Sequence, residues 1–87
     1  MTAERTPITM YGTTWCPDCI RSKRLLDRHA ITYTWVNIEE VPEAAGLVRR
    51  LNHGMQVVPT IVLPDGTTLA EPSDKELAQA LGLAERR

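Results

Sequence analysis

The chain has 87 residues, of which 43% are hydrophobic and 24% are charged, a composition typical of one small globular domain. Ten lysines and arginines nearly balance eleven aspartates and glutamates, so the net charge of −1 argues against a nucleic-acid or anionic-membrane partner. The longest apolar run, VVPTIVL, is too short to span a bilayer, and the first residues carry no apolar signal core. We therefore expect a cytoplasmic protein.

The first half of the chain predicts a strand, a helix and a second strand. Residues 1–6 are predicted to form a flexible N-terminal tail, and residues 7–87 a single domain. The run ITMY predicts a short strand ended by Gly12. A helix then runs from Pro17 to about His29, because proline lacks an N–H that would have no intrahelical partner at this position. The residues expected on its inner face are Cys19, Ser22, Leu26 and Ala30. The run TYTWVNI alternates with the period of a strand.

The second half of the chain predicts a helix, a hairpin and a closing helix. The second helix begins at Pro42 and ends at NHG, residues 52–54. The runs TIVL and TTLA flank a PDG turn and predict an antiparallel hairpin. The last helix runs from Ser73 to about Leu83, and Ser73 and Glu76 predict a capping box. The core positions expected in these helices are Ala44, Leu47, Val48 and Leu51, then Leu77, Ala80, Leu81 and Ala84. The order βαβαββα predicts an α/β three-layer sandwich with a four-stranded mixed sheet.

Two cysteines three positions apart, Cys16 and Cys19, occupy the predicted turn from the first strand to the first helix. Unpaired backbone N–H groups and the positive end of a helix stabilise a thiolate, which is the nucleophilic form of cysteine. The helical period turns Cys19 inward and leaves Cys16 at the exposed mouth of the helix. We therefore interpret the pair as a redox couple.

Other uses of the two cysteines have less support. A disulfide staple across so short a loop removes little entropy from the unfolded chain. Structural zinc requires four ligands, and the other candidates, His29 and His53, have spacings that fit no usual zinc finger. A cluster held by Cys16 of two subunits is a further alternative.

Asp18, between the two cysteines, raises a question that the sequence leaves open. A carboxylate that faces Cys16 disfavours a second negative charge, whereas one that faces water suits the first turn of a helix. The same helix carries four basic residues, Arg21, Lys23, Arg24 and Arg28. They either form a solvated face or offset Asp18 and attract acidic thiol substrates.

The segment QVVPTIVL places a proline at the start of the third strand. Proline is often found there for reasons of strand geometry alone. In a chain of this topology, however, the turn returns beside the first one, and the Val58–Pro59 bond would then be cis and face Cys16. The backbone of Val58 would be free to pair with an extended thiol substrate.

WCPDC, VVPT and PSDKEL, in this order, resemble motifs of the glutaredoxin family in the thioredoxin superfamily, and the resemblance runs from Ile8 to about Leu83. Within the family the chain is most similar to the mycoredoxins, through TTWC, VNIEE, NHGMQVVPT and DGTTLAEPS. The resemblance implies a thioredoxin-like fold. It implies that Cys16 is the nucleophile and Cys19 the resolving cysteine. The substrate-binding residues it suggests are Pro17, Val58, the cis-proline Pro59, and Ser73 and Asp74 at a helix start that binds a carboxylate. Trp15 either lines the same groove or caps the core.

The resemblance also implies a function. We expect a thiol-disulfide oxidoreductase that reduces mixed disulfides between proteins and a small thiol of the mycothiol, bacillithiol or glutathione type. Its expected partners are that thiol as co-substrate, thiolated or disulfide-bonded proteins and a recycling reductase; we expect a monomer with no metal and no tightly bound cofactor. Thr13, Asp18 and the run LAEPS depart from the pattern of glutathione-using members. Two alternatives stay open: a dithiol donor to protein disulfides recharged by a flavin reductase, and a metal or Fe–S binding module.

Overall fold

The computed structural model describes residues 8–83, and it contains the seven elements in the predicted order. They are β1 (Ile8–Gly12), α1 (Pro17–Arg28), β2 (Tyr33–Asn37), α2 (Pro42–Leu51), β3 (Thr60–Val62), β4 (Thr68–Ala70) and α3 (Asp74–Leu81). The prediction of βαβαββα is confirmed. The tail predicted for residues 1–6 and the core position predicted for Ala84 lie outside the described residues.

The four strands form one mixed sheet in the order β2-β1-β3-β4. β1 is central: it pairs in parallel with β2, where Met10 lies opposite Trp35, and antiparallel with β3, where Met10 lies opposite Ile61. β4 pairs antiparallel with β3 through the turn that contains Gly66, whose φ of +94° suits glycine. The carboxyl end of β1 therefore leads into α1 from the middle of the sheet.

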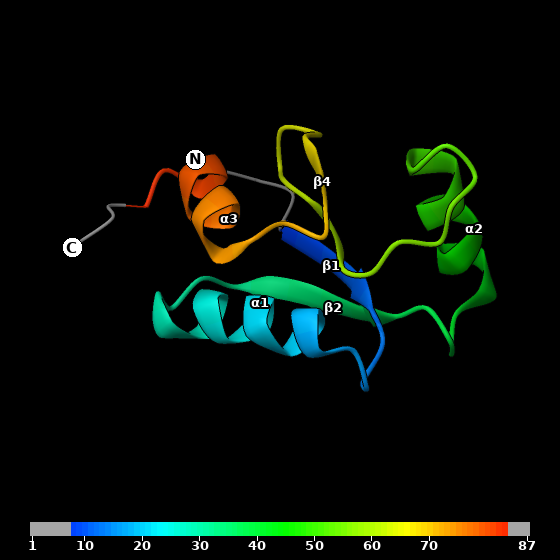
Figure 1. Cartoon of the computed structure of the whole chain (residues 1–87), viewed down its shortest axis with the longest axis horizontal. Coiled ribbons are helices and arrows are strands. Elements are labelled where there is room, and N and C mark those ends of the chain that lie inside the picture. Colours follow the sequence, from blue (N-terminus) through cyan, green and yellow to red (C-terminus); the bar gives the residue numbers. More distant parts are fainter. Residues whose placement is uncertain (1–7, 84–87) are drawn as a thin grey trace, which may run out of the picture.

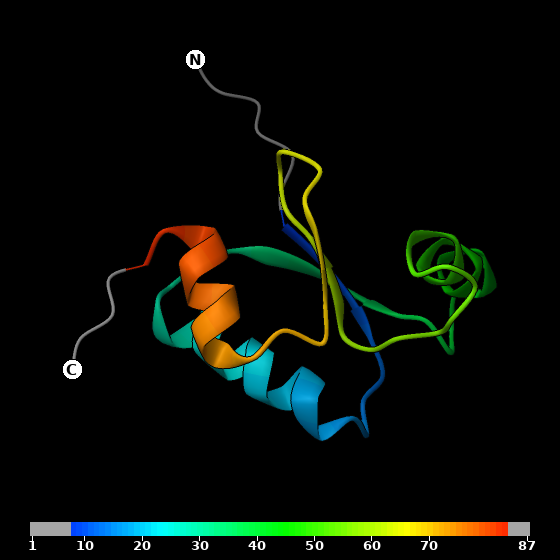
Figure 2. The same ribbon diagram turned by 45° about the horizontal axis from the view of Figure 1, so that its top comes forward.

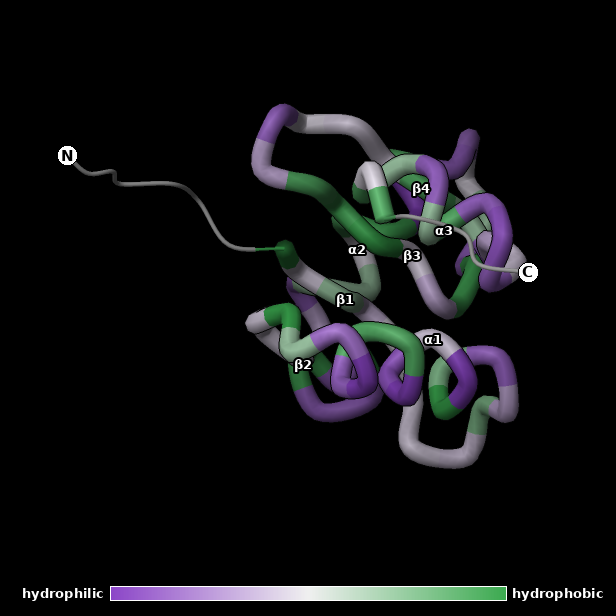
Figure 3. Tube along the Cα trace, turned by 90° about the vertical axis from the view of Figure 1, so that its left-hand side faces the viewer, coloured by the Kyte–Doolittle hydropathy of each residue, from purple (hydrophilic) through white to green (hydrophobic). Residues whose placement is uncertain are grey.

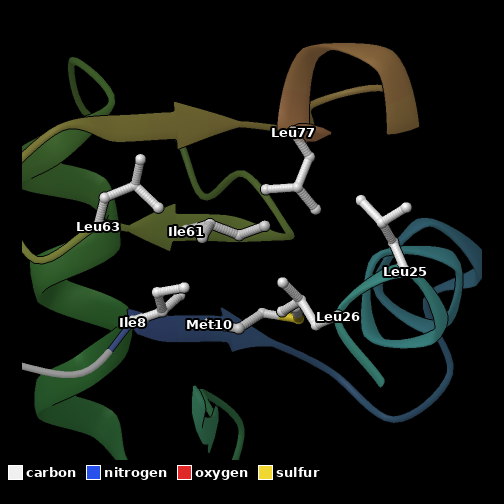
Figure 4. Packing of buried hydrophobic residues seen from close by; sticks show 7 residues of the cluster. All are labelled: Ile8, Met10, Leu25, Leu26, Ile61, Leu63 and Leu77. Atoms are coloured by element: carbon white, nitrogen blue, oxygen red, sulfur yellow. The ribbon is translucent and has the colours of Figure 1, made fainter. Parts of the chain in front are cut away.

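Helices cover both faces of the sheet. In Figures 1 and 2, α1 and α3 lie on one side of the strands and α2 stands apart on the other. Two groups of buried side chains agree with this arrangement. The larger joins the sheet to α1 and α3 and comprises Ile8, Met10, Leu25, Leu26, Ile61, Leu63 and Leu77 (Figure 4). The smaller joins the sheet to α2 and comprises Ile38, Ala44 and Val48. The predicted three-layer sandwich is confirmed.

The helix ends follow the sequence signals. Pro17 and Pro42 occupy the first turns of α1 and α2. Ser73 and Glu76 form the predicted capping box, with Ser73 Oγ accepting from the Glu76 N–H at 3.1 Å and Glu76 Oε1 accepting from the Ser73 N–H at 2.9 Å. Along α1, hydrophilic and hydrophobic segments alternate, as expected of a helix with one buried face (Figure 3).

Four alanine and leucine positions differ from the prediction. Leu47, on α2, is only half-buried and belongs to neither group of core side chains. Ala30 is exposed because α1 ends at Arg28 and the chain then turns through a left-handed residue, Ala30 itself, with φ of +56°. In α3 the buried alanine is Ala78, and the predicted Ala80 is exposed. Leu51, the last residue of α2, is 38% exposed, since the helix ends beyond the edge of the smaller core.

Candidate active site

Cys16 occupies the N-cap of α1, directly after the loop that leaves β1. Its backbone is extended, with φ of −79° and ψ of 118°, and its Sγ accepts a hydrogen bond from the N–H of Cys19 at 3.2 Å. The side chain thus takes the place of the serine or aspartate oxygen that caps many helices. A thiolate at this position faces an unpaired donor and the positive end of the helix dipole.

The expectation that Cys16 lies at an exposed mouth is wrong. The residue is only 5% exposed. Its side chain folds back over the first turn of α1, and its thiol approaches the carbonyl oxygen of Val58 at 3.8 Å. The order of the two cysteines still holds, because Cys19 is 1% exposed and lies deeper. The sulfur of Cys16 is therefore sheltered by the segment before β3.

Cys19 points into the interior between α1 and the sheet. Burial, followed by the hydrogen bond and charge of Cys16, raises the pKa of the Cys19 thiol from 9.0 to about 12, although a backbone hydrogen bond from Thr13 and the charge of Lys23 act in the opposite direction. Both cysteines are free thiols. The Cys19 thiol is consequently protonated at neutral pH, and Cys16, at the N-cap of α1, is the less deeply buried of the two cysteines.

Gly12 makes room for Cys19. A Cβ atom on Gly12 would lie 2.5 Å from Cys19 Sγ and 3.0 Å from the nearest carbon of the Trp35 ring. Gly12 is predicted only as the end of a strand; in the structure it is the last residue of β1 and also borders the redox pair. In the sequence, the feature that could have indicated this role is a glycine four residues before the first cysteine. The reason for the glycine is visible only in the packing of Cys19 and Trp35 against it.

The Val58–Pro59 segment lies beside Cys16, as predicted, and its peptide bond is cis. The carbonyl oxygen of Pro59 accepts from the N–H of Glu71 at 2.8 Å, which ties the segment to the end of β4. Thr60 Oγ1 donates to the carbonyl of Val57 at 2.7 Å and accepts from Asn52 Nδ2 at 3.1 Å. The segment around Val58 and Pro59 is thus fixed by hydrogen bonds to the residue after β4 and to the C-cap residue of α2.

Asp18 is paired rather than directed at the sulfur. Its Oδ1 accepts from Arg21 Nη1 at 2.9 Å, one turn along α1, and both side chains are about half exposed. Arg21 also lies 3.4 Å from Asp74 Oδ1 through its Nε and donates to the carbonyl of Pro72 at 3.3 Å. Arg21 therefore joins the start of α1 to the start of α3 and compensates the charge of Asp18.

Part of the start of α3, which is predicted to bind a carboxylate, is paired within the chain. The N–H groups of Ser73 and Glu76 are used in the capping box, and Asp74 lies beside Arg21. These contacts bring Ser73 and Asp74 to the same corner as Asp18. They give the helix start a structural role, and carboxylate binding by Ser73 and Asp74 stays a prediction.

Trp15 precedes Cys16 and lies on the surface. It is 64% exposed, and its indole N–H donates to Glu39 Oε2 at 3.0 Å, so the alternative that it caps the core is wrong. Pro17 is also exposed, at the first position of α1. Both residues flank Cys16 in the sequence and are exposed, and Trp15 is held to the connection between β2 and α2 by its bond to Glu39.

Within residues 8–83, no three or more His, Cys, Asp and Glu side chains come close enough together to hold a metal ion. In the same part of the chain, every helix is too short or too polar to cross a membrane. The chemistry that the arrangement offers is that of two adjacent thiols, one at a helix start and one buried behind it.

Comparison with known proteins gives a consistent result. The family model described as Glutaredoxin matches residues 8–67. A Mycobacterium tuberculosis protein assigned to the glutaredoxins is 40% identical over 74 residues, which cover 85% of this chain and 88% of that protein. Mycoredoxin 1 of Corynebacterium glutamicum is 33% identical over 70 residues, which cover 80% of this chain and 86% of the relative.

Solved structures agree on the fold. Methanoredoxin of Methanosarcina acetivorans superposes with a TM-score of 0.75 at 30% identity, covering 91% of this chain and 87% of the other. The glutaredoxin-like NrdH-redoxin of Escherichia coli superposes with a TM-score of 0.75 at 24% identity, covering 92% and 100% of the two chains. The four-stranded sheet with its helices is thus the thioredoxin-like fold.

Proposed function

Since this chain belongs to the glutaredoxin family and is a glutaredoxin-like thiol-disulfide oxidoreductase with a Cys16–Cys19 pair, we propose that it reduces mixed disulfides between proteins and a small thiol of the mycothiol type. The observation that carries the proposal is the position of Cys16 as N-cap of α1, with its sulfur 3.2 Å from the N–H of Cys19. The similarity to mycoredoxin 1 favours a thiol of the mycothiol type over glutathione. The reducing cytoplasm is the compartment that suits two free thiols.

The reaction begins with attack by the Cys16 thiolate on the small-thiol sulfur of the mixed disulfide. The bond between the two substrate sulfurs breaks, the protein thiolate leaves and takes a proton, and the small thiol stays on Cys16. A second small thiol, as its thiolate, then attacks the sulfur of the small thiol bound to Cys16, so that the two small thiols form a disulfide and Cys16 leaves as a thiolate. Alternatively, the Cys19 thiolate attacks Cys16 Sγ, the Cys16–Cys19 disulfide forms, and the small thiol leaves as a thiolate that takes up a proton. The proposed roles of Val58 and Pro59 are to align the incoming disulfide, because the Val58 carbonyl lies 3.8 Å from the reacting sulfur.

Two cysteine variants test the proposal. The substrate is a peptide whose single cysteine carries mycothiol as a mixed disulfide, and mass spectrometry follows release of the free peptide. Cys16→Ser should abolish release, because no nucleophile remains at the helix start. Cys19→Ser should retain release in excess mycothiol through the route that needs one cysteine. A fully active Cys16→Ser protein would overturn the proposal.

The same variants separate this function from that of a dithiol donor to protein disulfides. If Cys19→Ser is nearly inactive with mycothiol and the parent protein is instead sustained by a flavin reductase, the dithiol function replaces the proposed one. Parallel assays with glutathione and bacillithiol in place of mycothiol identify the preferred co-substrate. The ratio of kcat/KM values is the measure, because an enzyme discriminates between competing substrates by this ratio.

A further inference from the structure

Lys23 lies one helical turn after Cys19, on the same side of α1, and it is held against the sheet. Its Nζ is 3.6 Å from the centroid of the Trp35 ring. An ammonium over an indole face is attracted by the ring quadrupole, so the long lysine side chain is fixed rather than extended into water. Trp35 comes from β2, and the contact therefore joins helix and sheet next to the redox pair.

Trp35 and Cys19 meet at Gly12. The place where a Gly12 Cβ would stand is 2.5 Å from Cys19 Sγ and 3.0 Å from the Trp35 ring, so the sulfur and the ring are no more than about 6 Å apart. The lysine, the indole and the buried sulfur thus form one packed group at the end of β1. The positive charge reaches the neighbourhood of Cys19 without itself being buried as deeply.

Burial is the main cause of the raised pKa of the Cys19 thiol, and the charges of Cys16 and Lys23 act on that pKa in opposite directions. Cys16, on the same helix, raises the pKa of Cys19 through its hydrogen bond and its charge, whereas the charge of Lys23 lowers it. When Cys16 carries a small thiol as a mixed disulfide, its negative charge no longer exists. Of these two charges, only that of Lys23 then remains beside Cys19 at the moment when Cys19 must attack.

We propose that Lys23, oriented by Trp35, is a positioning residue that favours the Cys19 thiolate in the resolving step. The inference rests on the proposed function, because it requires a mixed disulfide on Cys16. In that step the Cys19 thiol loses its proton, its thiolate attacks Cys16 Sγ, and the Cys16–Cys19 bond forms while the bond to the small thiol breaks. The small thiol leaves with the electron pair and takes up a proton from water, so Cys19 is oxidised and the small thiol is reduced.

Alkylation of Cys19 provides the first test. In the Cys16→Ser background, iodoacetamide reacts only with Cys19, and its rate between pH 8 and 10 follows the thiolate fraction. Lys23→Met should lower this rate about three- to tenfold at each pH, corresponding to a pKa half to one unit higher. Lys23→Arg should restore the rate, and Arg24→Gln, an exposed basic residue on the same helix, is the matched control.

The direction of the change separates electrostatics from a loosened structure. A merely structural role for Lys23 would open the site on substitution, and alkylation of the buried sulfur would become faster. An unchanged or faster rate in Lys23→Met therefore overturns the inference. Trp35→Leu should also slow alkylation, because the ammonium is no longer held beside the sulfur; a parental rate in this variant contradicts the role given to the indole.

Single turnover separates this inference from the proposed function. The parent protein is loaded with mycothiol on Cys16, and release of mycothiol with formation of the Cys16–Cys19 disulfide is followed by mass spectrometry. Lys23→Met should slow this release about three- to tenfold. In the Cys19→Ser background, adding Lys23→Met should have no further effect on turnover. Failure to load Cys16 at all would overturn the proposed function, whereas loading followed by release at the parental rate would overturn only the inference.

Discussion

At the scale of single residues, Gly12 determines how closely Cys19 approaches the sheet. Its lack of a side chain lets the Cys19 sulfur and the Trp35 ring share a space that a methyl group would fill. Since protein interiors are close-packed, a clash there cannot be relieved by one flexible side chain. Gly12 therefore links the packing of β1 to the redox pair.

Gly12→Ala should lower the free energy of unfolding by about 1–3 kcal/mol, the usual cost of overpacking a core. Urea denaturation under reducing conditions measures the change. Gly46→Ala is the matched control, because Gly46 lies within α2 and its added Cβ would stand 3.7 Å from the nearest side-chain atom, of Arg50. That variant should gain about 0.5–1 kcal/mol, since alanine is the better helix former. Equal stabilities of the two variants would contradict this account of Gly12.

At the scale of elements, α3 is placed by its first turn and by one contact with α1. The capping box satisfies the N–H groups of Ser73 and Glu76, and Arg21 connects Asp74 with Asp18. The carboxylates and Arg21 are about half exposed, so these ion pairs contribute about 1 kcal/mol or less. Loss of the Ser73 cap leaves the N–H of Glu76 without its partner, so it should lower the free energy of unfolding more than loss of an ion pair.

Ser73→Ala should destabilise the protein by about 1 kcal/mol, the usual value for loss of a helix cap, and thermal unfolding measures it. Ser73→Asp should keep nearly the parental stability, because aspartate is also a good N-cap. The same pair tests the predicted binding of a carboxylate at this helix start. The KM of the Ser73→Asp variant is compared with that of the parent for each thiol. A stable variant whose KM rises for glutathione and not for mycothiol would show that Ser73 contributes to binding. A KM equal to that of the parent for both thiols would leave Ser73 as a helix cap alone.

Elements were predictable from local chemistry, and the contacts between them were not. Proline at helix starts, the Ser73 cap and the turn at Gly66 act over a few residues, and all are found where the sequence predicts them. The burial of Cys16 depends on Val58, 42 positions away in the chain, and the pairing of Arg21 with Asp74 on the docking of α3. The prediction that Ala80 rather than Ala78 is buried is wrong for another reason. A side chain as small as that of alanine carries little information about which face of a helix is buried.

At the scale of the whole molecule, the buried Cys19 thiol makes folding stability depend on alkaline pH. Its pKa is raised from 9.0 to about 12, mainly by burial, so the folded chain keeps a proton that the unfolded chain loses above pH 9. The contribution of Cys19 is therefore fully present below pH 9 and is lost as the pH rises toward 12. Below pH 9 both states hold the proton, and no dependence on Cys19 is expected.

The comparison of the parent with Cys19→Ser isolates this effect, because tyrosines and lysines titrate in both proteins. Under reducing conditions, the difference in unfolding free energy should be constant from pH 6 to 8. Above pH 9 the unfolding free energy of the parent should fall, relative to that of Cys19→Ser, by up to about 1.4 kcal/mol per pH unit, which is the slope for one proton. Urea denaturation at intervals up to pH 10.5 gives the curve. A difference that stays flat over this range would mean that water reaches Cys19 in the folded state, and the deep position of the Cys19 sulfur would be wrong.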